Sequence, residues 1–116
     1  MITGLDHIAI IVSAEAGIEF YTGLGFIEEE RYDRGYDTIV YMKGYGIILE
    51  IYVDATHPQR ITNPEAMGLR HLALRADHLE QTIRELGVDA EPIREKDGRR
   101  YTFIKDPDGL PIELYE

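Results

Sequence analysis

Two histidines and two glutamates stand at matched positions along this chain, and their side chains are suited to binding one divalent metal ion. His7 precedes Glu50 by 43 residues, and His71 precedes Glu113 by 42 residues. Imidazole nitrogens and carboxylate oxygens are ligands that zinc, nickel, cobalt, manganese and iron(II) accept in proteins. Two carboxylates and two neutral imidazoles would also balance the charge of a +2 ion. We therefore expect one divalent metal ion bound by His7, Glu50, His71 and Glu113. The ligand types do not decide which metal it is.

The sequence around the four candidate ligands is duplicated. Residues 5–10, Leu-Asp-His-Ile-Ala-Ile, correspond to residues 69–74, Leu-Arg-His-Leu-Ala-Leu. Residues 48–52, Ile-Leu-Glu-Ile-Tyr, correspond to residues 111–115, Pro-Ile-Glu-Leu-Tyr. Self-similarity at a fixed spacing is the mark of a repeated structural unit. We expect a single domain that contains a first module, a linker and a second module, at residues 1–53, 54–68 and 69–116 of the 116-residue chain.

Both modules predict the same order of elements, which is one strand, one helix and three further strands. Strand and helix periods of apolar residues, separated by glycine-rich turns, place the elements of the first module at 5–12, 14–24, 26–32, 37–42 and 47–53. The elements of the second module are expected at 69–76, 79–86, 88–94, 99–105 and 111–115. The prediction is an α+β fold of two βαβββ modules, each a short sheet backed by one helix.

Strand alternation predicts that the four candidate ligands share one kind of sheet face. Every second residue of the segment 8–12 is bulky and apolar, starting with Ile8, so His7 points to the opposite face from the helix. The other three candidate ligands follow the same rule. A lone histidine or glutamate on a strand is usually hydrogen-bonded or solvated. Four of them at duplicated positions with one facing favour a shared metal ion, which offsets the cost of burying them.

The overall charge argues against nucleic-acid and membrane partners. The chain has 22 acidic and 12 basic residues and a net charge of -10, whereas phosphate-rich surfaces attract basic proteins. No apolar run is long enough to cross a bilayer, and the N-terminal residues lack the pattern of a signal peptide. The absence of cysteine excludes disulfides, thiolate ligands and cysteine nucleophiles. We expect a cytoplasmic protein that acts on a small molecule.

The chain resembles the glyoxalase/bleomycin-resistance/extradiol-dioxygenase superfamily, also called the vicinal oxygen chelate superfamily, over essentially its whole length. The matching segments are 5–10, 19–26, 68–73 and 106–114, and the segments 63–71 and 100–103 are similar to short bacterial glyoxalase I-like (lactoylglutathione lyase-like) proteins. The resemblance implies the vicinal oxygen chelate fold, in which two modules form a curved mixed sheet cup, and a homodimer. The glyoxalase I ligands correspond here to His7, Glu50, His71 and Glu113.

The same resemblance implies the reaction. Glyoxalase I catalyses a metal-dependent 1,2-proton shift on a thiol hemithioacetal, an α-hydroxy carbonyl compound, through an enediolate. The metal ion stabilises the enediolate, and a carboxylate removes and returns the proton. Glu113 and Glu50 are the candidate catalytic residues, and the family likeness favours Glu113 as the base.

Four residues of the second module are candidate substrate contacts. Tyr101 and Phe103 alternate along one strand and are expected to line the cup, while Arg70 and Arg100 are expected to meet an anionic group of the substrate. The alternative is that the two aromatic rings pack in the core or an interface and that the two arginines are solvated.

Two departures from glyoxalase I concern its thiol. Those enzymes typically hold glutathione with an arginine four residues after the first histidine ligand and an asparagine four residues after the first glutamate ligand. This chain has Ile11 and Asp54 at those positions, which disfavours glutathione and leaves other thiol adducts open.

Two other functions remain as alternatives. One is a methylmalonyl-CoA epimerase-like enzyme, although epimerases generally have glutamine in place of Glu50. The other is a metal-dependent or non-catalytic antibiotic-binding protein of the bleomycin-resistance type, although these generally lack the ligand set.

Overall fold

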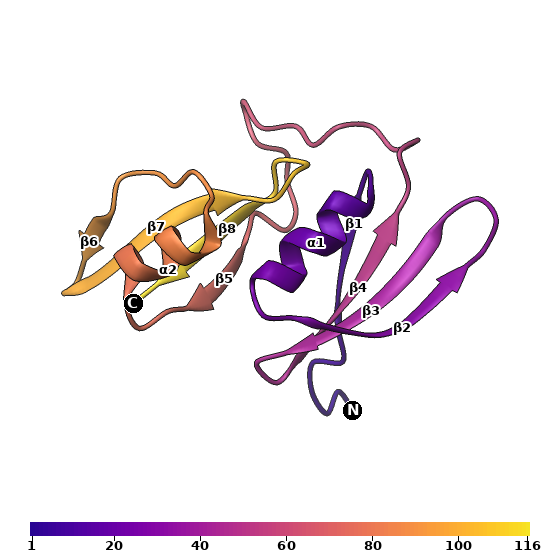
Figure 1. Cartoon of the computed structure of the whole chain (residues 1–116), viewed down its shortest axis with the longest axis horizontal. Helices are drawn as coiled ribbons and strands as arrows, with labels where there is room; N and C mark the ends of the chain where they lie inside the picture. Colours follow the sequence, from indigo (N-terminus) through magenta and orange to yellow (C-terminus); the bar gives the residue numbers. More distant parts are fainter. The chain divides into compact units, whose positions relative to one another are not determined.

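Each half of the chain contains one strand, one helix and three further strands in that order, which confirms the predicted pair of βαβββ modules (Figure 1). The computed structural model describes all residues, Met1–Glu116, in two compact units, Met1–Pro58 and Gln59–Glu116. The elements of unit 1 are β1 (Ile8–Val12), α1 (Glu15–Gly23), β2 (Ile27–Asp33), β3 (Thr38–Gly44) and β4 (Ile47–Val53). The elements of unit 2 are β5 (Leu72–Arg75), α2 (Leu79–Leu86), β6 (Arg94–Lys96), β7 (Arg99–Lys105) and β8 (Pro111–Tyr115). Neither helix has the length and apolar character needed to span a bilayer.

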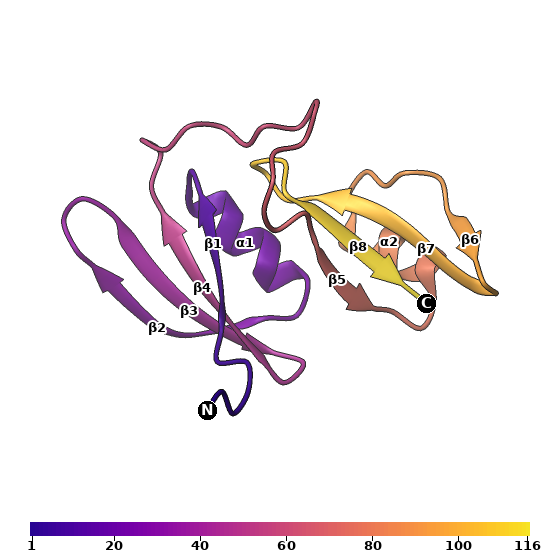
Figure 2. The ribbon, with the colours of Figure 1, turned by 180° about the vertical axis from the view of Figure 1, so that it is seen from behind.

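The sheet of unit 1 has the strand order β1-β4-β3-β2. Its β1 strand runs parallel to β4, and the other neighbouring strands are antiparallel. Helix α1 covers one face of this sheet, as seen from opposite sides in Figures 1 and 2. Leu49 and Ile51 of β4 are fully buried on that side, together with Tyr21 of the helix. The alternation predicted for β4 is therefore confirmed, and Glu50 between these two residues points to the other face.

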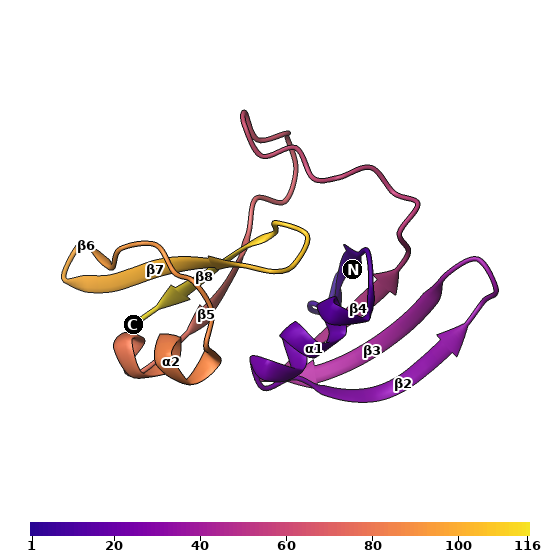
Figure 3. The ribbon, with the colours of Figure 1, turned by 45° about the horizontal axis from the view of Figure 1, so that its top comes forward.

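The sheet of unit 2 repeats this arrangement with the order β5-β8-β7-β6. Helix α2 lies along one face of the sheet (Figure 3). Ile112 and Leu114 of β8 and Leu79 of the helix form the buried layer. The helix ends as predicted at Gly87, which adopts a left-handed conformation (φ 64°) that an L-residue side chain disfavours.

The predicted strand at 88–94 is wrong, because regular pairing begins only at Arg94 in β6. Pro92 interrupts this segment and has no backbone N–H to donate to a neighbouring strand. Glu91 still attaches the segment to β7. Its backbone N–H donates to the Phe103 carbonyl at 3.0 Å, and its own carbonyl accepts the Thr102 hydroxyl at 2.6 Å.

A two-residue turn at Tyr45 and Gly46 sets the register between β3 and β4. Both residues have positive φ values, 56° and 77°, as the tight hairpin turn that matches strand twist requires. Pairing then proceeds outward from Gly44 opposite Ile47 and places Tyr41 opposite Glu50. The turn therefore decides which side chain of β3 stands beside a candidate ligand.

Gly17 lies where α1 packs most closely against β1. A Cβ atom at Gly17 would lie 2.6 Å from the Val12 Cβ atom, well inside van der Waals contact. We expect Gly17→Ala to lower the free energy of unfolding by about 1–3 kcal/mol, because the overpacking outweighs the better helix propensity of alanine. Gly23→Ala in the same helix is the matched control, since a Cβ there meets nothing within 4 Å. Urea unfolding measures both changes, and equal stabilities of the two variants would contradict the prediction.

Candidate metal centre

His7 and Glu50 meet on the face of the unit 1 sheet away from α1, and we call this pair half-site 1. The His7 Nε2 atom lies 3.6 Å from the Glu50 Oε1 atom. The pair arises because β1 and β4 are parallel neighbours with Ala9 opposite Glu50, and His7 lies two residues before Ala9 on the same side. The Glu50 residue is only 8% exposed, so its carboxylate depends on nearby polar partners for stabilisation.

Asp6 holds the other ring nitrogen of His7. The Asp6 Oδ1 atom lies 2.7 Å from His7 Nδ1 and accepts a hydrogen bond from it. With the proton on Nδ1, the Nε2 atom presents its lone pair toward Glu50, which is the tautomer that metal-binding histidines use. The Asp6 hydrogen bond is the largest cause that raises the pKa of His7, and the charge of Glu50 adds to it against the opposing effect of desolvation.

Two tyrosines hold the carboxylate of Glu50. The Tyr41 hydroxyl, directly across the ladder, donates a hydrogen bond to the Glu50 Oε2 atom. This bond is the main reason that the pKa of Glu50 lies below its ordinary value, with a further hydrogen bond from Tyr52 and an opposing contribution from desolvation. The negative carboxylate in turn raises the pKa of Tyr41 to about 12, chiefly through the same hydrogen bond. Glu50 is therefore held in its charged form, as a metal ligand must be.

His71 and Glu113 form the matching pair in unit 2, which we call half-site 2. Their Nε2 and Oε1 atoms are 3.6 Å apart, the same separation as in half-site 1. Both side chains are partly buried, with 26% of His71 and 14% of Glu113 exposed. As in unit 1, the histidine lies just before an edge strand and the glutamate lies on the parallel neighbour, here β5 and β8.

Two of the predicted substrate contacts, Arg70 and Phe103, lie at half-site 2. The Phe103 ring packs edge-on against His71 with 5.2 Å between ring centroids, and the Arg70 guanidinium carbon lies 5.8 Å from the Phe103 ring centroid. The Arg70 Nη1 atom is 3.1 Å from His71 Nδ1, and its Nε atom is 3.0 Å from a carboxylate oxygen of Glu65. Arg70 therefore brings a positive charge to the edge of half-site 2.

The other two predicted contacts lie in different surroundings. Tyr101 shares the face of Phe103, with 6.3 Å between the ring centroids, and stacks on Tyr115. Arg100 instead forms an ion pair with Glu80 of α2 and a second one, at 3.4 Å, with Glu116. The structure therefore brings Tyr101 together with half-site 2 but not Arg100, which lies on the helix side of the sheet.

The ligand atoms of each half-site lie slightly farther apart than two ligands of one divalent ion. Two ligands of one ion at bond lengths of about 2.0–2.2 Å lie about 3.0–3.5 Å apart. The nitrogen–oxygen separations of 3.6 Å in both half-sites are close to this range. Each pair supplies one imidazole and one carboxylate, and no group of three or more histidine, cysteine, aspartate or glutamate side chains is placed to hold a metal ion. Two ligands alone make a weak metal site.

The sequence reasoning missed the residues that surround the ligands in unit 1. Tyr41 and Tyr52 hydrogen-bond Glu50, and Asp6 orients His7. The signal for Tyr41 was present, because counting outward from the glycine-flanked turn at Tyr45 pairs it with Glu50. Asp6 directly precedes the first candidate ligand, and a carboxylate beside a metal-binding histidine is a common second partner.

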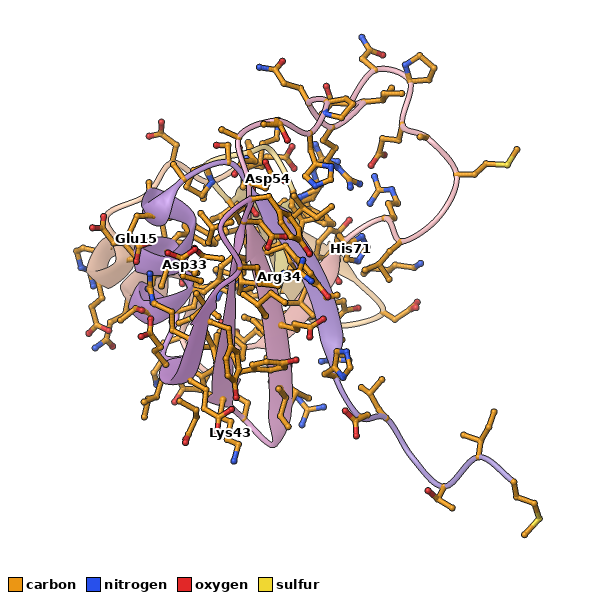
Figure 4. All side chains as sticks on the ribbon, turned by 90° about the vertical axis from the view of Figure 1, so that its right-hand side faces the viewer. Glu15, Asp33, Arg34, Lys43, Asp54 and His71 are labelled. Atoms are coloured by element: carbon orange, nitrogen blue, oxygen red, sulfur yellow. The ribbon has the colours of Figure 1, made fainter.

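An arginine that the sequence analysis did not single out lies near half-site 1. The Arg34 guanidinium carbon is 5.6 Å from the centroid of the Tyr52 ring, and the side chain is paired in bidentate fashion with Asp37. Figure 4 shows Arg34 and Asp54 at the same end of the unit 1 sheet, with Lys43 at the opposite end. Asp54 accepts hydrogen bonds from Thr56, and the side chain of Ile11 is exposed.

Comparison with known proteins agrees with the fold. Residues 4–114 match the family described as the Glyoxalase/Bleomycin resistance protein/Dioxygenase superfamily. The chain is 40% identical to the uncharacterized protein YwkD of Bacillus subtilis, with 100% of this chain and 98% of YwkD covered. It is 39% identical to the uncharacterized protein YaeR of Escherichia coli, with 97% and 95% covered.

A solved structure extends the comparison to three dimensions. The crystal structure of a glyoxalase family protein from Enterococcus faecalis superposes with a TM-score of 0.89 at 38% sequence identity, and 97% of each chain is covered. The shared architecture is the pair of βαβββ modules described above. The chain therefore belongs to the glyoxalase/bleomycin resistance protein/dioxygenase superfamily and has its vicinal oxygen chelate fold.

Proposed function

We propose that this protein is a metal-dependent enzyme of the glyoxalase I type, which catalyses a 1,2-proton shift on a small α-hydroxy carbonyl compound or thiol hemithioacetal. The observation that supports this proposal is the pair of half-sites. Each offers an imidazole nitrogen and a carboxylate oxygen 3.6 Å apart on the face of its sheet away from the helix. Two His–Glu pairs are the ligand set of glyoxalase I, and this chain holds all four residues.

The metal ion would be held by His7, Glu50, His71 and Glu113. When bound, it supplies Lewis acidity that stabilises negative charge developing on vicinal substrate oxygens. Zinc, nickel, cobalt, manganese and iron(II) all suit this mixed nitrogen and oxygen set. Because the four ligands come from two compact units, we propose that a complete centre combines half-site 1 with half-site 2, in a homodimer, either within one chain or between two chains.

Glu113 is the proposed base. It removes the proton from the carbon bearing the hydroxyl and returns it to the neighbouring carbon, while the hydroxyl proton passes to the former carbonyl oxygen, so that no proton is gained or lost overall. Its carboxylate is 14% exposed, beside the apolar ring of Phe103, which limits competition by water. Glu50 is the second carboxylate, and its hydrogen bond from Tyr41 suits it to remain a ligand throughout.

Substrate contacts are proposed around half-site 2. Phe103 and Tyr101 offer apolar ring surface on the face of Glu113, and Arg70 offers a positive charge next to His71. This combination suits a small substrate with an apolar part and one anionic group. Arg100 would have to leave Glu80 before it contacted such a substrate.

The test is metal analysis of protein purified without chelator, followed by activity assays. The protein is reconstituted with each divalent ion in turn and assayed with methylglyoxal plus several thiols, glutathione among them. We expect about one metal ion per site and isomerisation of at least one hemithioacetal. Less than about 0.2 metal ions per chain after reconstitution would contradict the proposed centre, since a site with four such ligands binds tightly. Bound metal without isomerase activity on any thiol adduct would favour the epimerase-like or antibiotic-binding alternatives.

A further inference from the structure

Two arginines of unit 2 approach the same carboxylate beside half-site 2. The Arg70 Nε atom lies 3.0 Å from the Glu65 Oε1 atom, and the Arg60 Nη2 atom lies 3.9 Å from the Glu65 Oε2 atom. The same Arg60 nitrogen donates a hydrogen bond to the Arg70 backbone carbonyl at 2.8 Å. We call Arg60 and Arg70 the arginine pair. Two positive charges thus share one negative charge, and the cluster keeps a net positive charge.

Glu65 satisfies the arginine pair only in part. Its 3.9 Å separation from the Arg60 nitrogen is too long for a hydrogen bond. The Arg60 Nε atom is buried and has no hydrogen-bond partner. Buried donors without a partner are rare in folded proteins, because losing water without gaining an acceptor is costly. An anion that approached both guanidinium groups would match the arginine pair better than Glu65 does.

The contact between Glu65 and Arg70 is accessible to solvent. The side chains of Arg70 and Glu65 are 59% and 31% exposed. Ion pairs of this kind contribute little to stability, because water competes for both charges. Glu65 also lies in the connecting segment 54–68, where a single bridge to Thr62 is its only strand-like pairing. An external anion that competes with Glu65 therefore has little stabilisation to overcome.

The arginine pair is connected to half-site 2 through Arg70. The Arg70 Nη1 atom lies 3.1 Å from His71 Nδ1, and the guanidinium carbon lies 5.8 Å from the centroid of the Phe103 ring. His71 is a proposed metal ligand, and Phe103 is a proposed contact for the apolar part of the substrate. The position that Glu65 occupies is thus one side chain away from the proposed metal centre, which suits it to an anionic group of a bound substrate.

We propose that Arg60 and Arg70 form a binding site for an anionic group of the substrate, a carboxylate or a phosphate, and that Glu65 occupies this site until the substrate replaces it. Both kinds of anion offer the paired oxygen atoms that guanidinium groups bind. Glu65 then determines specificity, since an anionic substrate replaces its contacts and a neutral substrate does not. The inference rests on the proposed function and adds two residues, Arg60 and Glu65, to the proposed substrate contacts.

The first test measures binding of acetate and of inorganic phosphate to the full chain without added metal, with acetamide as the uncharged control for acetate. NMR titration follows the Nε–H signals of Arg60 and Arg70. We expect at least one of the anions to bind, and acetamide not to bind. Glu65→Gln removes the competing charge and should lower the Kd of the anion about 2- to 5-fold, the size of one exposed ion pair. Glu95→Gln is the matched control, because Glu95 is an exposed carboxylate on β6 outside this cluster.

The arginine variants are expected to have the opposite effect. Arg60→Gln and Arg70→Gln should each raise the Kd of the same anion about 10-fold or more, the usual effect of losing a hydrogen bond to a charged group. Arg94→Gln is their matched control, because Arg94 is exposed on β6. Arg70→Gln keeps the test decisive if Arg60→Gln fails to fold, since the Arg70 side chain is largely exposed. Circular dichroism shows whether each variant is folded.

The second test compares an anionic with a neutral substrate of similar size in the metal-loaded protein. The substrates are the hemithioacetals that methylglyoxal forms with mercaptoacetate and with 2-mercaptoethanol. We expect Glu65→Gln to lower KM for the mercaptoacetate adduct about 2- to 5-fold, for the same reason as in the binding test. Its kcat, and its KM for the 2-mercaptoethanol adduct, should equal the wild-type values.

The outcomes separate this inference from the proposed function. An unchanged or higher Kd of the anion in Glu65→Gln would make Glu65 a positioning residue for Arg70 and overturn the inference. Wild-type protein that binds neither anion would overturn it as well, and so would equal binding by wild type and both arginine variants. Because the binding test needs no metal ion, a chain that binds the anions as expected but has no isomerase activity would contradict the proposed reaction and support the anion site.

Discussion

Replacing Glu113 by glutamine is expected to lower kcat for a thiol hemithioacetal by about 100- to 10,000-fold, which is the range that a positioned general base contributes. The amide keeps the size of the carboxylate but cannot accept the substrate proton. The other three ligands are unchanged and the glutamine amide still offers an oxygen, so the variant should still bind metal, although more weakly than wild type. The measurement is kcat of the metal-loaded enzyme alongside metal content per chain.

The matched control for Glu113→Gln is Glu95→Gln. Glu95 is an exposed carboxylate on β6, and its replacement makes the same chemical change away from both half-sites. We expect wild-type kcat from this control. Full turnover by Glu113→Gln would remove Glu113 as the base and leave Glu50 as the remaining candidate carboxylate.

Loss of either histidine ligand is expected to raise the Kd for metal by more than about 100-fold, beyond the effect of losing an outer partner. We expect His7→Ala to cost more than His71→Ala, because the His7 ring is held by Asp6 in the tautomer that binds metal. Titration of each purified variant with Co(II) against a competing chelator measures both values. His57→Ala is the control, because His57 pairs with Asp54 and belongs to neither half-site.

Mixing the two histidine variants tests how half-sites combine. If a complete centre joins half-site 1 of one chain to half-site 2 of another, a mixed dimer of His7→Ala and His71→Ala chains regains one intact centre. An equimolar mixture with free exchange should then recover about a quarter of the wild-type activity, because half of the dimers are mixed and each has one of two centres intact. Recovery of no activity after verified exchange would assign the centre to a single chain.

The ligand-bearing strands were predictable from the sequence because their signals are local. The bounds of β4, β7 and β8 agree with the predicted segments, since each has an alternating apolar pattern bounded by turn residues. The two His–Glu pairs followed from the duplication together with the same alternation. Both kinds of pattern depend on neighbouring residues in the chain and need no knowledge of tertiary packing.

What the sequence did not predict depends on partners far away in the chain. Arg100 was expected near substrate because of its charge, but its ion pair with Glu80 depends on how α2 lies on the sheet. The strand expected at 88–94 failed for a local reason, since Pro92 cannot join a ladder. The role of Tyr41 needed the strand register, which a count from the hairpin turn supplies only once the hairpin itself is recognised.

The pairing of Tyr41 with Glu50 depends on the exact length of the two-residue turn at Tyr45 and Gly46. One residue inserted there would shift β3 against β4, bring Val40 or Met42 opposite Glu50, and turn Tyr41 toward the buried layer. The same insertion in the segment 54–68 would change no strand pairing. We therefore expect relatives that keep the Tyr41–Glu50 hydrogen bond to vary in the length of the connecting segment and to preserve the length of the hairpin. An alignment gap at the turn would then mark the loss of this hydrogen bond, even in a relative that retains all four ligands.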